Sequence, residues 1–185
     1  MNTIAKEIRK LPMPCIIGLP VIMIALLLIK FEDAEPFDLL WRELLIVFGY
    51  IAAIIDIKTK RVPNKLVITM LVVWLFIMTA MMLIDIDRAV VFLTDSALGF
   101  ALSGGVFMTV YLISRKGLGG GDVKFAAASG LYLGVGGILP AIFIGTVLAA
   151  LIGGILILTK KIKRKDPIPL IPFLFAGMLI TIFLS

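Results

Sequence analysis

The chain has 185 residues, 61% of them hydrophobic, and a formal net charge of +6 at pH 7. It contains no histidine and one cysteine, Cys15, which excludes Ser-His-Asp and Cys-His nucleophilic systems, two-histidine zinc sites, and CxxC zinc or redox pairs. Because soluble proteins are usually about 45–50% apolar, the composition predicts an integral membrane protein, with Cys15 a small apolar residue of a span.

Apolar runs of about 20 residues, the length that a helix needs to cross the hydrocarbon core, predict an all-α bundle of about seven transmembrane helices. In chain order the runs cover residues 11–29, 39–57, 66–84, 89–114 (or 96–114), 122–135, 138–158 and 170–184. We expect the first to be a retained helix, because it is long for a signal peptide and no A-x-A site follows it. The fifth would reach only about 21 Å, which predicts that Asp122 lies slightly below the membrane surface.

Lysine and arginine predict the orientation, since cytoplasmic loops retain them. With the N-terminus inside, all but three of the 18 basic residues fall in cytoplasmic segments, and the exceptions are Lys30, Arg42 and Arg88. The outer loops are conversely acidic. We therefore predict a cytoplasmic N-terminus and an external C-terminus, and we interpret the positive charge as a topology signal and not as a nucleic-acid site.

Two acidic residues stand apart from those that lie in loops and termini. Asp56 closes the second predicted span and Asp122 opens the fifth, so both belong to the cytoplasmic end of the bundle. Glu43 and Asp95 lie near outer ends of spans, where placement at the wet interface explains them. A pair of carboxylates can hydrolyse a peptide, because one ionised acid takes a proton from water while its protonated partner polarises the scissile carbonyl.

Structural roles compete with this interpretation. Asp122 could be an N-cap that complements the helix dipole, and Asp56 could be an ordinary interfacial residue beside lysines. Three glycines, Gly119, Gly120 and Gly121, precede Asp122. They permit positive φ and close approach of a substrate strand, although a flexible loop explains them as well.

Two segments resemble the type IV prepilin peptidases and the related archaeal preflagellin peptidases. The first runs from Asp56 to Asn64, where an aspartate closes a helix before a basic loop that ends in Val-Pro-Asn. The second, Gly119 to Lys124, is a GxGD sequence with a lysine two residues later. A weaker similarity is the proline-rich segment 168–174, and the resemblance covers about residues 44–185.

The resemblance implies a membrane-embedded aspartic endopeptidase with Asp56 and Asp122 as catalytic residues and with no metal or cofactor. Its partners would be the lipid bilayer and pilin-like precursors, whose basic leader precedes a hydrophobic helix and is removed at the cytoplasmic face of the cell membrane. Four further residues of the motif would bind substrate or shape the loop: Gly119, Gly120, Gly121 and Lys124. The positive-inside rule alone also accounts for Lys124 and is the favoured explanation.

Larger members of that family carry a cytoplasmic insertion near the N-terminus with paired CxxC zinc ligands, and they also N-methylate the mature pilin. This sequence has one cysteine and no such insertion, so it resembles the compact Flp/Tad or archaeal preflagellin type, and we expect no methyltransferase activity. We expect one peptidase domain over residues 1–185. It would consist of an extra N-terminal helix with its outer loop (1–38) and a GxGD core (39–185).

Two alternatives compete with the prepilin peptidase. Presenilin-like and signal-peptide-peptidase-like proteases share GxGD but pair it with a Tyr-Asp dipeptide, whereas Asp56 follows Ile55. A small transporter or scaffold would use the two aspartates to relay protons or bind cations, and would need polar residues through the membrane midplane. The spans carry mainly Ser, Thr and Gly there, which favours the peptidase.

Overall fold

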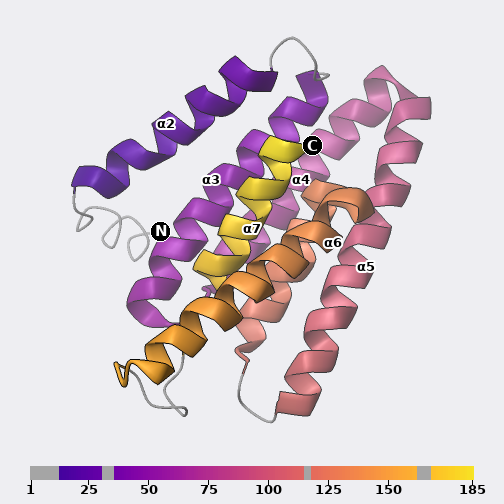
Figure 1. The fold of residues 1–185 in the computed structure, drawn as a ribbon. Helices are drawn as coiled ribbons and strands as arrows, with labels where there is room; N and C mark the ends of the chain where they lie inside the picture. Colours follow the sequence, from indigo (N-terminus) through magenta and orange to yellow (C-terminus); the bar gives the residue numbers. More distant parts are fainter. Residues whose placement is uncertain (1–12, 31–35, 115–117, 162–167) are drawn as a thin grey trace.

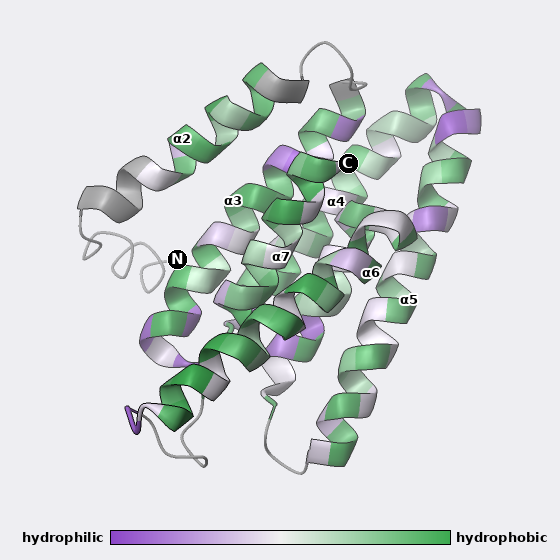
Figure 2. Ribbon diagram, viewed as in Figure 1, coloured by the Kyte–Doolittle hydropathy of each residue, from purple (hydrophilic) through white to green (hydrophobic). Residues whose placement is uncertain are grey.

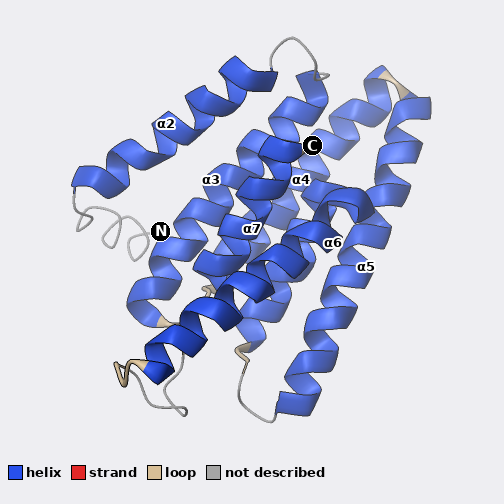
Figure 3. Ribbon diagram, viewed as in Figure 1, coloured by secondary structure: helices blue, strands red, loops and turns tan. Residues whose placement is uncertain are grey.

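The structure, a computed structural model, describes residues 13–30, 36–114, 118–161 and 168–185. These residues form helices and short loops, with no strand in the described ranges (Figure 3). Part of the predicted charge topology, including the basic residues near the N-terminus and those in 162–167, lies outside the described residues. The helices form a bundle (Figure 1), and their bounds are α2 Met13–Lys30, α3 Pro36–Thr59, α4 Asn64–Ile84, α5 Ile86–Ser114, α6 Gly120–Leu158 and α7 Ile171–Leu184.

The described residues of each predicted apolar run lie in one of these helices, apart from Leu170, which is the N-cap of α7. By length and composition, three of the described helices, α4, α5 and α6, are long and apolar enough to cross a membrane, and Gly18–Leu28 and Ile171–Leu184 are shorter apolar helices. Apolar residues cover the helices, while hydrophilic residues gather at the two ends of the bundle (Figure 2). The prediction of an all-α membrane protein is therefore confirmed. The number of spans and the side of the N-terminus stay predictions.

The fifth and sixth predicted runs join in α6, which bends sharply at its middle. Gly134 has φ 61 and ψ −171, a conformation that breaks the helix and that favours glycine. Figure 1 shows the chain turning back there, so that the first residue and the last residue of α6 lie at the same end of the bundle. Asp95 of α5 accepts a hydrogen bond from the backbone N–H of Val135 (3.1 Å), which caps the second half. The interfacial interpretation of Asp95 did not anticipate this role.

Gly134→Ala is expected to lower the stability of the bundle by about 1–2 kcal/mol or more from backbone strain alone. In addition, a Cβ at this position would overlap the Asp95 carboxylate. The matched control is Gly136→Ala, because a Cβ at the exposed Gly136 meets nothing within 4 Å. Thermal unfolding in detergent measures both variants, and equal midpoints for the two would contradict this account of the bend.

Glu43 differs from its prediction. Both of its carboxylate oxygens are buried, and no described residue hydrogen-bonds to them. The side chain does not reach solvent in the way that interfacial placement requires, because α3 is packed on most of its faces by neighbouring helices.

The first half of α6 is the centre of the bundle. Every residue from Phe125 to Tyr132 is buried, which accounts for the small side chains of this segment. Three side-chain hydrogen bonds join it to α4 and α5: Ser103 Oγ to Ala126 O (2.6 Å), Trp74 Nε1 to Leu131 O (3.1 Å), and Tyr132 OH to Met70 O (2.7 Å). The start of α6, which carries Asp122, is therefore continuous with a buried segment that hydrogen bonds fix to α4 and α5.

Candidate active site

Asp56 lies in the last turn of α3, at the end of the bundle where α3 stops and α4, α6 and α7 begin, which we call the aspartate end. Its side chain is only 2% exposed. The helix ends at Thr59 because Lys60 takes a left-handed conformation (φ 52), and the Lys60 N–H donates to the carbonyl oxygen of Asp56 (2.7 Å). Pro63 then stands at the N-cap of α4. The basic loop of the first motif is thus a tight turn beside Asp56.

A contact with α7 holds the Asp56 carboxylate. Its Oδ2 accepts a hydrogen bond from the backbone N–H of Ile171 (3.1 Å), the first residue of α7. The first N–H groups of a helix have no partner within the helix and carry its positive dipole, so they suit a carboxylate. Sequence reasoning did not predict this contact, although Pro172 in the first turn of α7 marks where such donors become available.

Asp122 lies in the first turn of α6 and not at its N-cap. Gly119 is the N-cap residue, and Asp122, three residues later, accepts the Gly119 N–H through Oδ2 (3.2 Å). This is half of a capping box, because glycine has no side chain to complete it. The N-cap alternative is therefore wrong in position, but part of the Asp122 carboxylate does stabilise the helix start.

Both aspartates belong to the aspartate end. Asp122 lies close enough to Asp56 for the two side chains to repel each other electrostatically. They approach from different directions, since Asp56 is buried against α7 while Asp122 is partly exposed. Both aspartates therefore lie at the same end of the bundle, as the charge topology predicted, and the approach of one carboxylate to the other stays a prediction.

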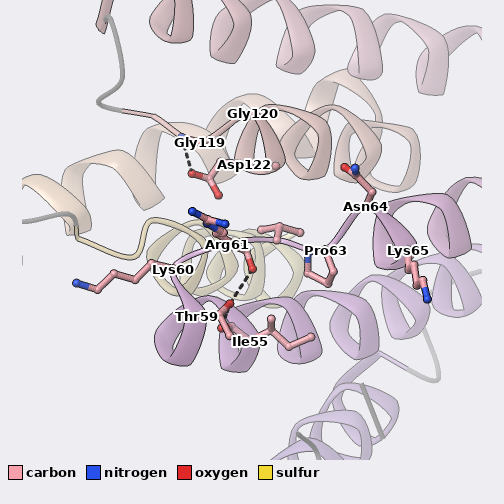
Figure 4. Close-up of a pocket in the computed structure, with 12 residues that line it drawn as sticks. Ile55, Thr59, Lys60, Arg61, Pro63, Asn64, Lys65, Gly119, Gly120 and Asp122 are labelled. Carbon is pink, nitrogen blue, oxygen red and sulfur yellow. Dashed lines mark hydrogen bonds between the residues drawn. The ribbon is translucent and has the colours of Figure 1, made fainter. Parts of the chain in front are cut away.

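A pocket of about 690 Å³ opens beside Asp122. Its walls come from the two motif segments: the end of α3 and the following turn on one side, and the start of α6 on the other (Figure 4). Asp122 lines the pocket, and three basic residues line the opposite wall: Lys60, Arg61 and Lys65. Asp56 is not part of the lining. Asp122 is thus accessible from the pocket, whereas Asp56 is buried.

Gly121 brings the two motif segments into contact. A Cβ at Gly121 would stand 2.8 Å from the carbonyl oxygen of Val62, so only glycine lets the α3–α4 turn lie against α6 this closely. At Gly120 a Cβ would meet nothing within 4 Å. The three glycines permit positive φ but do not adopt it: among the described glycines positive φ occurs only at Gly134, and Gly119 has φ −78. The glycines were expected to let a substrate strand approach closely. At Gly121 the segment that approaches is the protein's own α3–α4 turn.

Lys124 forms a second connection between these segments. Its Nζ donates a hydrogen bond to Oδ1 of Asn64 (3.1 Å), the first residue of α4. In the described residues, Lys124 therefore links the start of α6 to the start of α4. Asn64 was not singled out from the sequence, although it ends the Val-Pro-Asn segment of the first motif.

Among the residues that the structure describes, no group of three or more His, Cys, Asp or Glu could hold a metal ion. Fold and site together define a helical membrane protein with paired carboxylates beside an open pocket, an arrangement suited to hydrolysis. The chain belongs to the type IV leader peptidase family, which it matches over residues 43–157.

Curated relatives agree with this family. The chain is 31% identical over 131 residues to the prepilin leader peptidase/N-methyltransferase of Bacillus subtilis, covering 70% of this chain and 50% of that protein. It is 33% identical over 125 residues to the protein of the same name from Xanthomonas campestris pv. campestris, covering 65% and 41%. For the one from Stutzerimonas stutzeri the identity is 26% over 160 residues, covering 84% and 54%.

The chain thus spans about half the length of the curated relatives that it matches. No solved structure shows significant similarity to it.

Proposed function

We propose that this protein is a membrane-embedded aspartic peptidase that removes the leader from pilin-like precursors. Asp56 and Asp122 are its catalytic residues. The observation that supports the proposal is their common location: two acids 66 positions apart in the sequence lie at one end of the bundle, and Asp122 lines a pocket built from both motifs. Family membership supports the choice of a peptidase over a transporter or scaffold.

The chemistry follows from two carboxyl groups that share one proton. The ionised carboxylate takes a proton from a water molecule, and the water oxygen attacks the scissile carbonyl carbon. The protonated partner donates a hydrogen bond to the carbonyl oxygen as negative charge develops there. When the tetrahedral intermediate collapses, the C–N bond breaks and the leaving amine takes up a proton from the carboxyl pair.

The site acts at the cytoplasmic face of the cell membrane. Basic residues gather at the aspartate end, including Lys58 and Lys60 after Asp56 and Lys160 after α6. Lysine and arginine mark the cytoplasmic side of membrane proteins. A precursor with a polar leader and an apolar helix can then place its leader in the pocket region while its helix stays in the bilayer.

Methyl transfer is not part of the proposed activity, although the names of the curated relatives include it. In the larger family members that activity accompanies paired CxxC zinc ligands, and the 185-residue sequence contains a single cysteine.

The proposed function is tested by incubating the purified chain in lipid with a pilin-like precursor. We expect one cut between leader and apolar helix, seen by mass spectrometry, and no methyl group on the new amino terminus. A precursor without its basic leader serves as the control and should remain intact. Failure to cut the complete precursor, or equal cutting of both, would contradict the proposed function.

A further inference from the structure

A second pocket, of about 380 Å³, opens on the outer surface of the bundle and begins at Val123 and Lys124, directly after Asp122 in α6. Residues of α4, the middle of α5 and the first two turns of α6 line it: Asn64, Val67, Ile68, Leu71, Phe100, Val123, Lys124, Ala127 and Ala128. We call it the α4–α6 groove. Apart from Asn64 and Lys124 at one end, all of these residues are apolar.

The groove has a buried floor and exposed walls. Val67, Ala127 and Ala128 are buried, whereas Ile68 is 57% exposed and Leu71 is 38% exposed on the outer surface of α4. Small residues on the floor let another helix approach closely, which is how helices associate within a membrane. The volume is too small for a whole helix, but it admits the side chains of one helix face.

The polar end of the groove adjoins the candidate active site. Asn64 lines both this groove and the pocket beside Asp122, and its hydrogen bond to Lys124 stands where the two spaces meet. Lys124 lies only two residues after Asp122. From Asn64 to Leu71 the groove follows α4 for about 10 Å, or two helical turns.

We infer that the α4–α6 groove binds the first two turns of the precursor's apolar helix, which begin directly after the scissile bond. This inference rests on the proposed function. The bound helix runs parallel to α4, its amino-terminal end lies at the aspartate end, and the positive end of its dipole faces the two carboxylates. The leader, on the other side of the cut, occupies the polar pocket. The Asn64–Lys124 hydrogen bond marks the boundary between the two parts of the substrate.

Cross-linking tests the inference in a Cys15→Ser background. Leu71→Cys places a thiol in the groove, and Phe76→Cys places one on the same helix, 76% exposed but outside the groove. Asp122→Asn is added to keep the substrate uncut, and the precursor carries one cysteine in the first two turns of its apolar helix. We expect cross-linking at position 71 to exceed that at position 76 at least fivefold. A lipid-soluble maleimide must label both thiols.

A kinetic pair provides a second measurement. Leu71→Trp, in an otherwise unaltered chain, should raise KM severalfold with little change in kcat, because it obstructs binding and leaves the carboxylates in place. Phe76→Trp should alter neither constant. Equal cross-linking at 71 and 76 would mean that lipid fills the groove, and either this result or no cross-link at 71 would overturn the inference. If the unaltered chain does not cut the precursor, the proposed function fails instead.

Discussion

Asp56→Asn and Asp122→Asn are each expected to abolish leader removal, with a loss of at least about 100-fold, because an amide can neither take a proton from water nor supply one. Both substitutions preserve the shape and the acceptor oxygen. Asn at position 56 still accepts the Ile171 N–H, and Asn at position 122 still accepts the Gly119 N–H. The measurement is the initial rate of precursor processing at equal amounts of folded protein.

The matched control for these variants is Asp95→Asn. Asp95 also caps a backbone N–H, that of Val135, but the pockets that it lines lie at the opposite end of the bundle. Its asparagine variant should process the precursor at the rate of the unaltered chain. Full activity in either Asp56→Asn or Asp122→Asn would refute the catalytic pair.

Gly121→Ala is expected to reduce processing by about 10- to 100-fold, since small displacements of catalytic groups have effects of this size. The added Cβ would stand 2.8 Å from the Val62 carbonyl oxygen and 3.3 Å from its nitrogen. Both are backbone atoms, so the α3–α4 turn and the first turn of α6 must separate. That separation moves Asp122 away from Asp56. Gly121→Val should be more severe than Gly121→Ala.

Gly120→Ala is the control for this experiment, because it changes the adjacent glycine of the same motif at a position with open space. Its kcat should be unchanged because the added Cβ displaces no backbone, and any effect should be confined to KM because Gly120 lines the pocket. The loss in Gly121→Ala should appear in kcat more than in KM, because the altered contact lies within the protein. If alanine at 120 and at 121 had the same effect, the close contact with Val62 would not explain the motif.

The hinge of α6 shows how far sequence patterns reach. The sequence predicted two separate apolar runs, residues 122–135 and 138–158, and the helix breaks at Gly134, one residue before the end of the first run. The capping of the second half by Asp95 depends on a residue of α5 that lies 40 positions away in the sequence. Local patterns carry no information about which distant carboxylate meets a free N–H group.

The sequence by itself determined the all-α membrane architecture, because apolar runs of bilayer length leave helices as the only way to pair backbone groups. It also identified Asp56 and Asp122, since two acids at the ends of apolar helices need an explanation, and the flanking motifs resembled one family. Only the tertiary structure decided what surrounds them: Ile171 of α7 on Asp56, Val62 against Gly121, and Asn64 with Lys124. Each of these contacts joins helices distant in the chain, and their partners are set by packing geometry, which helix length and hydropathy do not encode.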